Sequence, residues 1–263
     1  LWNLTLQHQI DRALKKGEIF PVFQPQFSLV SGEVVGVEAL VRWRDPKRGI
    51  IPPISFIEQC EQAGRITALT DFMLKKSMAE VKAIAASPLR LSVNISATLL
   101  QDGHLATMVY EALTEAQFDA TLLTLELTET WRVLDQKIAC SVMDEIKNFG
   151  VRWALDDFGI KSSTFEALLK YPFNELKIDR IFTSSIQDSV KGRSIIRSLC
   201  RLGTDNEIDI VAEGVETAAE YQTLSAIGCP IVQGFYLCKP LEIDRLRVFL
   251  MQGGKIPSSR GVV

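Results

Sequence analysis

Carboxylate, amide and ammonium side chains recur on or just after the apolar, strand-like segments of this chain. They are Glu38, Asn94, Glu126, Asp156 with Asp157, Lys177, Glu213 and Gln233. In a parallel α/β barrel, the carboxyl ends of all the strands meet at one face. Five carboxylates, two amides and one ammonium group would then converge on a single mouth.

Converging carboxylates repel one another unless positive charge lies between them. Lys177 supplies one positive charge, and divalent cations would supply more. Oxygen ligands suit Mg²⁺ or Mn²⁺, and the two histidines, His8 and His104, stand far along the chain from any other candidate ligand. A set of this size can hold two ions, a common device for in-line phosphoryl displacement. The pattern therefore predicts a metal-dependent phosphoester hydrolase.

Each of these residues also has an ordinary structural explanation when it is taken alone. Glu38 could be a rim charge, Asn94 could cap the next segment, and Lys177 could be a surface lysine. Glu213 with Glu216 could be an acidic pair at a helix start, which the helix dipole favours. The catalytic interpretation rests on the whole set converging.

Eight strand-like runs would position these side chains. They cover residues 20–27, 34–43, 89–96, 122–129, 151–157, 175–179, 208–216 and 230–235. Amphipathic helical patterns lie between most of them, for example over 67–86 and 137–150. Such alternation predicts a parallel α/β fold, either a closed barrel or a doubly wound sheet. A hairpin-length loop separates the first two runs, so one strand should be antiparallel to the rest.

Composition narrows the functional classes. The 263 residues carry a net charge of −3 with no basic stripe, which disfavours binding to duplex nucleic acid. Five scattered cysteines indicate reduced thiols rather than a disulfide framework or a zinc site. No apolar run approaches the length of a membrane span, so we expect no membrane segment in this portion.

Seven motifs together resemble the EAL domain family, the phosphodiesterases of cyclic di-GMP signalling. They are EALVRW, VNIS, LELTET, DDFG, LKIDR, AEGVET and QGFYLCKP, in the family's order and spacing. The resemblance covers residues 6–250. It implies a TIM-like (β/α)8 barrel with one antiparallel strand. It also implies hydrolysis of one phosphodiester of 3′,5′-cyclic di-GMP to linear pGpG.

The resemblance further implies two Mg²⁺ or Mn²⁺ ions. Glu38, Asn94, Glu126 and Asp156 would hold the first ion. The second ion would share Asp156 and add Asp157 and Glu213.

The other site residues are implied in the same way. Lys177 would orient the nucleophilic water, with Glu38 and Gln233 beside it, and Glu129 would steady the loop after the sixth strand. The substrate-binding set would be Gln24, Arg42, Asp179 and Glu216. Arg42 would contact a phosphate, because its guanidinium fork suits that group. Asp179 and Glu216 would support the site.

The chain departs from the family in that loop. The family usually reads DDFGTGYSS, whereas this chain reads DDFGIKSSTF, with Ile160 and Lys161 replacing a threonine and a glycine and only Ser163 kept in place. A lysine would be strained where a glycine adopts a positive φ. Two hypotheses follow: an active phosphodiesterase, or a weak or inactive EAL domain that acts as a cyclic di-GMP receptor or a protein-interaction module.

We also expect a particular domain organisation. Residues 1–252 should form one barrel domain, and 253–263 should be a flexible tail. The first residue is Leu1 rather than Met, so we expect a fragment of a longer multidomain protein. A sensor or diguanylate-cyclase-type domain could precede it. The family tends to form homodimers near the altered loop, and we expect a cytoplasmic location, whether free or as part of a membrane-bound protein.

Overall fold

The computed structural model describes residues 2–101, 103–128, 135–159 and 164–256, and within them nine strands form one sheet. The strands are β1 (Ile19–Ser28), β2 (Val34–Asp45), β3 (Gly49–Ile51), β4 (Arg90–Asn94), β5 (Leu123–Thr128), β6 (Arg152–Phe158), β7 (Glu175–Ile178), β8 (Asp209–Ala212) and β9 (Ile231–Val232). The α-helices are α1 (Trp2–Lys15), α2 (Ile57–Gln62), α3 (Ile66–Ile84), α4 (His104–Ala116), α5 (Gln136–Asn148), α6 (Thr164–Lys170), α7 (Arg180–Ser185), α8 (Val190–Asn206), α9 (Ala218–Ile227) and α10 (Ile243–Met251).

Eight of the strands close into a barrel. The ring closes because β1 pairs with β2 on one side and with β9 on the other, while β3 lies outside it beside β2. Strand β1 is antiparallel to both neighbours, and every other pair in the ring is parallel. The predicted TIM-like (β/α)8 barrel with one antiparallel strand, including the β1–β2 hairpin, is confirmed.

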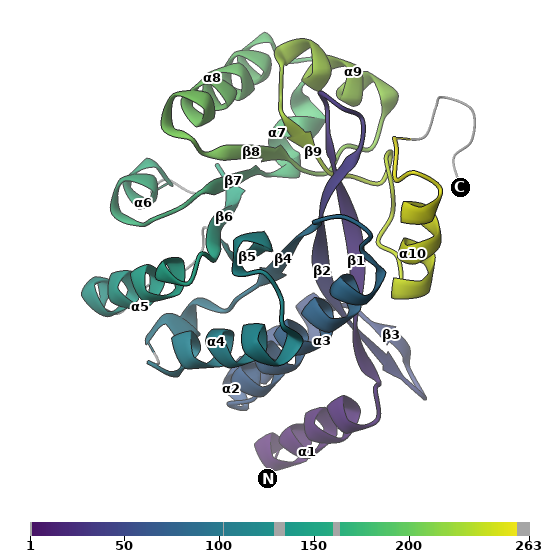
Figure 1. The fold of residues 1–263 in the computed structure, drawn as a ribbon, viewed down its shortest axis with the longest axis vertical. Coiled ribbons are helices and arrows are strands. Elements are labelled where there is room, and N and C mark those ends of the chain that lie inside the picture. The colour runs from purple at the N-terminus through teal and green to yellow at the C-terminus, as the bar shows by residue number, and fades with distance from the viewer. Residues whose placement is uncertain (1, 102, 129–134, 160–163, 257–263) are drawn as a thin grey trace.

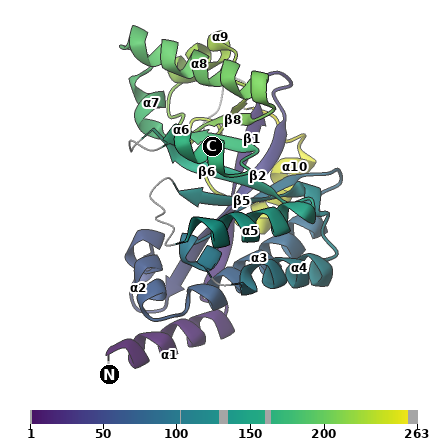
Figure 2. The same cartoon turned by 90° about the vertical axis from the view of Figure 1, so that its left-hand side faces the viewer.

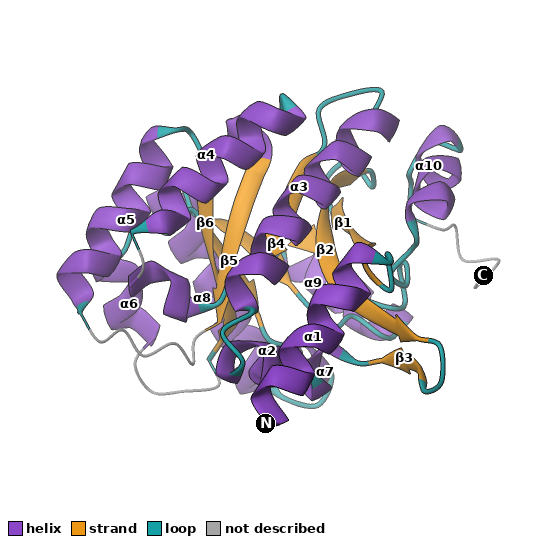
Figure 3. Ribbon diagram, turned by 90° about the horizontal axis from the view of Figure 1, so that it is seen from below, coloured by secondary structure: helices purple, strands orange, loops and turns teal. Residues whose placement is uncertain are grey.

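Helices lie outside the barrel strands (Figures 1 and 3). Helix α1 lies at one end of the molecule, and α8 and α9 lie at the other (Figures 1 and 2). The Trp153 side chain on β6 is fully buried, and its Nε1 donates a hydrogen bond of 3.1 Å to the Met143 carbonyl of α5. Burial of the Trp153 ring and the hydrogen bond of its N–H thus hold α5 against β6, one of the strands that carry candidate site residues.

The β1–β2 ribbon is longer than the other strands. It has 10 and 12 residues in its two strands, against 2 to 7 elsewhere in the described sheet. Gln24 stands opposite Glu38, and Phe20 stands opposite Arg42. Because alternate strand residues share a face, Glu38 and Arg42 lie on the same side of the ribbon.

A charged clamp joins strand starts at the opposite end of the barrel from the polar groups. Oδ2 of Asp209, at the start of β8, accepts hydrogen bonds of 2.6 Å from Arg90 on β4 and from Arg152 on β6. The clamp therefore fixes the relative positions of three strands whose other ends lead into candidate site residues.

The last two strands are shorter than predicted. The runs over 208–216 and 230–235 contain strands of only 4 and 2 residues. The chain turns at Gly214, which has a φ of +65°. Past the turn, the Val215 N–H donates to the Gln233 carbonyl at 3.1 Å. The segments after β8 and β9 therefore pack against each other as loops, which strand periodicity does not predict. Strand β3 and helix α1 were also not predicted.

The described part of the C-terminal segment contacts the β1–β2 loop. The Gly254 carbonyl accepts from the Val34 N–H at 2.9 Å, and the Ile256 N–H donates to Gly32 at 3.0 Å. Residues 257–263, on which the predicted flexible tail mostly falls, lie outside the described residues. None of the described helices is both long and apolar enough to cross a membrane.

Gly234 offers a direct test of the close packing between the segments that follow β8 and β9. A Cβ atom there would lie 2.1 Å from the Val215 carbonyl oxygen, whereas one at Gly103 would meet nothing within 4 Å. Neither glycine has a positive φ. We expect Gly234→Ala to lower the free energy of unfolding by about 3 kcal/mol, because overpacking against a backbone has no flexible side chain to absorb it.

Urea denaturation measures the free energy of unfolding of both variants. The matched control, Gly103→Ala, replaces the N-cap glycine of α4 without a clash and should lower the unfolding free energy by no more than about 1 kcal/mol. Equal effects of the two substitutions would contradict this packing.

Candidate active site

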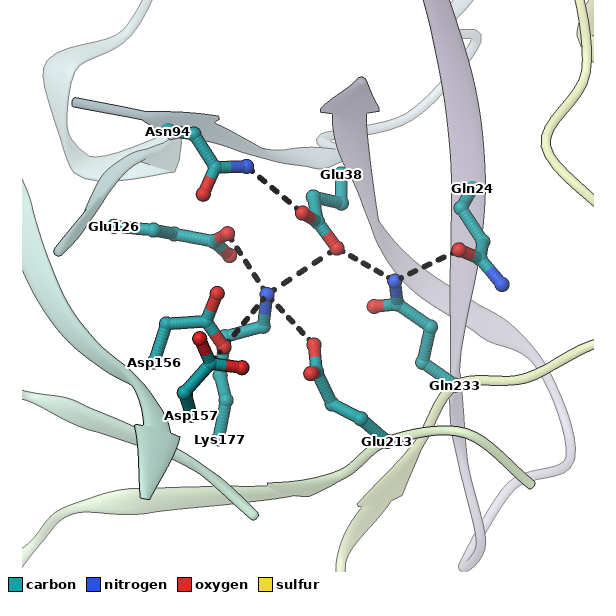
Figure 4. A network of polar contacts seen from close by, with 9 residues as sticks. All are labelled: Gln24, Glu38, Asn94, Glu126, Asp156, Asp157, Lys177, Glu213 and Gln233. Atoms are coloured by element: carbon teal, nitrogen blue, oxygen red, sulfur yellow. Dashed lines mark hydrogen bonds and ion pairs between the residues drawn. The ribbon is translucent and has the colours of Figure 1, made fainter. Parts of the chain in front are cut away.

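Nine polar side chains meet at the carboxyl ends of the parallel strands (Figure 4). They are Gln24, Glu38, Asn94, Glu126, Asp156, Asp157, Lys177, Glu213 and Gln233. The strands bring them together in register: Asn94 stands beside Glu126, and Thr128 beside Asp156. The residues singled out at the strand ends therefore do converge, and their individual catalytic and binding roles remain predictions.

The Lys177 ammonium lies at the centre of this cluster and is completely buried. It lies 2.7 Å from Glu213 and 2.8 Å from Glu126. Two further carboxylates, Glu38 and Asp156, lie 3.2 and 3.7 Å away. Four carboxylates from β2, β5, β6 and the end of β8 thus share one cation from β7.

These charges perturb one another. Burial disfavours the charged form of Lys177, but the carboxylates around it outweigh burial and hold its pKa well above the usual range. Burial, together with repulsion from nearby carboxylates, raises the pKa of Glu126 and Glu213 well above normal. One ammonium group cannot balance the cluster, so the excess is negative charge.

Glu38 is the best satisfied of the carboxylates. Its Oε1 accepts from Asn94 Nδ2 at 2.9 Å, and its Oε2 accepts from Gln233 Nε2 at 2.6 Å. Burial raises the pKa of Glu38, but the Lys177 charge and these amide hydrogen bonds lower it below its usual value. Gln233 also donates to Gln24 Oε1 at 3.2 Å, which joins the antiparallel strand to the network.

The two adjacent aspartates differ in conformation. The Asp157 N–H donates to Asp156 Oδ1 at 2.8 Å. Asp157 has a φ of +58°, a left-handed conformation that aspartate tolerates better than most residues. The β6–β7 register shifts at this point, so both carboxylates turn toward the cluster. Burial and then the Asp156 charge raise the pKa of Asp157 to about 6.

The donor set fits a divalent cation. Carboxylate oxygens of Asp156, Asp157 and Glu213 lie within 4.8 Å of one another. Glu126 Oε1 is buried without a hydrogen-bond partner among the described residues. A hard cation such as Mg²⁺ prefers oxygen ligands of this kind, and it would offset the excess negative charge.

A pocket of about 290 Å³ opens onto the cluster. Its described lining is Gln24, Glu38, Leu40, Asp156, Arg180, Glu213, Gly214, Glu216, Gln233, Gly234 and Phe235. Asn94, Glu126 and Lys177 lie beneath or beside this lining rather than in it. The pocket would admit a ligand directly over the carboxylates.

The remaining predicted residues lie further out. Arg42 lines a separate hollow with Phe20 and Val22 along the ribbon, and its Nη1 donates to the Val41 carbonyl. Asp179 caps α7 by accepting from the Ile181 N–H at 2.8 Å. Glu216 lies on the pocket rim. Glu129 lies outside the described residues.

Sequence patterns missed Arg180 and Phe235 in the pocket wall. Arg180 follows the Asp179 cap directly, and Phe235 follows the QG pair. The only sequence signal for them is their position just beyond a strand end that carries a candidate site residue. That signal is weak, because the side chain at such a position can point in any direction.

The family model of the EAL domain matches residues 7–240. The chain is 36% identical to a Caulobacter vibrioides protein named an uncharacterized signaling protein, over 95% of this chain and 31% of that protein. It is 32% identical to the Escherichia coli cyclic di-GMP phosphodiesterase PdeR, over 90% of this chain and 36% of PdeR. The chain thus spans about a third of the length of these relatives.

A solved structure has the same fold. The PaMucR phosphodiesterase in its c-di-GMP complex matches with a TM-score of 0.84 and 30% identity, over 92% of this chain and 99% of that one. The matched barrel, the strand-end motifs and the family model agree, and the chain belongs to the EAL domain family.

Proposed function

We propose that this chain hydrolyses one phosphodiester bond of 3′,5′-cyclic di-GMP and releases linear pGpG. The observation that carries the proposal is the convergence of four of the five carboxylates of the predicted metal set around buried Lys177. The names of PdeR and of the PaMucR complex support the choice of substrate.

The proposal includes two Mg²⁺ or Mn²⁺ ions. Glu38, Asn94, Glu126 and Asp156 would hold one ion, and Asp156, Asp157 and Glu213 the other. Bound ions of this kind supply Lewis-acid stabilisation of the phosphate charge and an activated water.

The protein groups orient the reactants. Lys177 is a hydrogen-bond donor to Glu126, so it would serve as a charged donor that offsets negative charge rather than as a proton acceptor. Gln233 fixes one oxygen of Glu38, and Asn94 fixes the other. These amides hold a carboxylate in one orientation before the substrate arrives, which reduces the reorganisation needed during the reaction.

The receptor or interaction-module function is the second candidate. It is favoured by Ile160 and Lys161, which replace the family's threonine and glycine directly after DDFG. These two positions lie outside the described residues. A domain of this second kind would bind cyclic di-GMP without turning it over.

The proposal extends to the whole protein. The chain spans about a third of the length of its curated relatives. The proposal therefore includes a sensor or diguanylate-cyclase-type domain that precedes this chain in the whole protein. MucR, for example, is named a bifunctional diguanylate cyclase and cyclic di-GMP phosphodiesterase. A single barrel domain over 1–252, a homodimer and a cytoplasmic location complete the proposal.

Turnover is the first test. Purified protein with Mg²⁺ or Mn²⁺ should convert cyclic di-GMP to pGpG, as measured by chromatography, and chelation with EDTA should stop the reaction. Glu38→Ala should reduce turnover at least about 100-fold, because it removes a ligand from a preorganised site. Binding without product under either metal would favour the receptor function. Normal turnover by Glu38→Ala would contradict the metal assignment.

Lys177→Met tests the central charge balance. In metal-free buffer the variant should lose about 3–5 kcal/mol of unfolding free energy, since buried carboxylates are left without their cation. The control Lys76→Met removes the pair, at 3.0 Å, between exposed Lys76 and half-buried Glu80, and it should cost less than about 1 kcal/mol. Chemical denaturation with and without Mg²⁺ measures both variants. A Lys177→Met protein as stable as the parent without metal would rule out this charge balance.

The double substitution Ile160→Thr with Lys161→Gly tests the altered loop. If position 161 requires a positive φ and the loop limits catalysis, kcat should rise several-fold, because a glycine adopts that conformation without strain. The affinity for cyclic di-GMP should change little. An unchanged kcat would mean that the natural residues at these positions are neutral.

A further inference from the structure

Arg180 is a cation on the wall of the active-site pocket that the predicted reaction does not use. It is the first residue of α7 and stands three positions after Lys177. Its side chain lines the same pocket as Glu38, Asp156 and Glu213. Among the described residues of that lining, it is the one cationic side chain.

The stem of Arg180 is held in place by the turn after β8. A Cβ atom at Gly214 would lie 2.6 Å from both Cβ and Cγ of Arg180. A side chain at position 214 would therefore displace the arginine. The glycine lets the aliphatic stem approach the backbone closely.

Glu216 holds the end of this side chain. Arg180 Nη2 donates to Glu216 Oε2 at 2.8 Å, and the Arg180 side chain remains 61% exposed. No other hydrogen-bond partner of the guanidinium is found among the described residues. A guanidinium has five N–H donors, so most of this fork stays available to a ligand.

The positive charge of Arg180 in the pocket wall indicates that it would bind an anionic group of the ligand. Cyclic di-GMP carries two phosphodiesters, each with one negative charge. Lys177 is completely buried and already surrounded by carboxylates, so it cannot reach a second phosphate at the rim. Arginine binds phosphate oxygens through two parallel N–H donors, which a lysine cannot reproduce.

We propose that Arg180 binds the phosphodiester of cyclic di-GMP that is not cleaved, while Glu216 keeps the guanidinium oriented. The proposal rests on the proposed function and deepens it. Arg180 then contributes to substrate affinity and not to the chemical step, because its contact is the same before and during bond cleavage.

The experiment compares Arg180→Gln, Arg180→Lys and a control, Arg201→Gln. Arg201 is 84% exposed on α8, where its side chain pairs with Asp205. Steady-state turnover with Mg²⁺ gives KM and kcat, and calorimetry in EDTA gives the Kd for cyclic di-GMP without turnover. Thermal unfolding midpoints verify that all the variants fold.

Arg180→Gln should raise KM or Kd at least about ten-fold and change kcat less than about three-fold, which corresponds to one charge-assisted hydrogen-bonded contact. The KM and Kd of Arg180→Lys should lie between those of Arg180→Gln and those of the parent. The KM and Kd of Arg201→Gln should match those of the parent. If the parent turns over or binds cyclic di-GMP and Arg180→Gln changes KM and Kd less than three-fold, the Arg180 inference is wrong and the proposed function stands. A parent that neither binds nor cleaves the dinucleotide would overturn both.

Discussion

The buried ammonium of Lys177 is the interaction on which the rest of the site depends. A fully enclosed cation is unfavourable unless carboxylates surround it, and converging carboxylates are unfavourable unless a cation lies among them. The ammonium group and the carboxylates therefore each offset the unfavourable burial of the other. The four ion pairs come from β2, β5, β6 and the end of β8, so the cluster forms only when the barrel is closed.

The barrel meets this requirement through backbone geometry at both ends. At the strand starts, Asp209 ties Arg90 and Arg152 together and fixes the relative positions of β4, β6 and β8. At the strand ends, Gly234 allows two loops to pack so closely that a Cβ atom would not fit, and Gly214 leaves room for the Arg180 side chain. Glu213 and Gln233 stand where these loops begin, and their N–H groups still donate to the Ile178 and Ala212 carbonyls of the neighbouring strands.

Much of this could be predicted from the sequence, because strand ends of a parallel barrel share one face. That rule was sufficient to bring Glu38, Glu126 and Lys177 together from positions far apart in the chain. It could not give the partners within the cluster, since which carboxylate lies nearest to Lys177 depends on side-chain packing. Nor could it place Arg42 along the ribbon, or Arg180 in the pocket wall, because side-chain direction beyond a strand end is set by tertiary packing.

The two functional candidates differ in one half of the site only. Glu38, Asn94 and Gln233 are held by mutual hydrogen bonds on β2, β4 and the end of β9, away in sequence from the altered loop. Asp157, by contrast, stands three residues before Ile160 and has a left-handed backbone at a register shift. In sequence, the altered loop therefore adjoins Asp157, a ligand of the second ion in the proposed function. Under the proposed function, the pocket residues outside the altered loop would still bind the ligand if the second ion were lost, so affinity and turnover would separate.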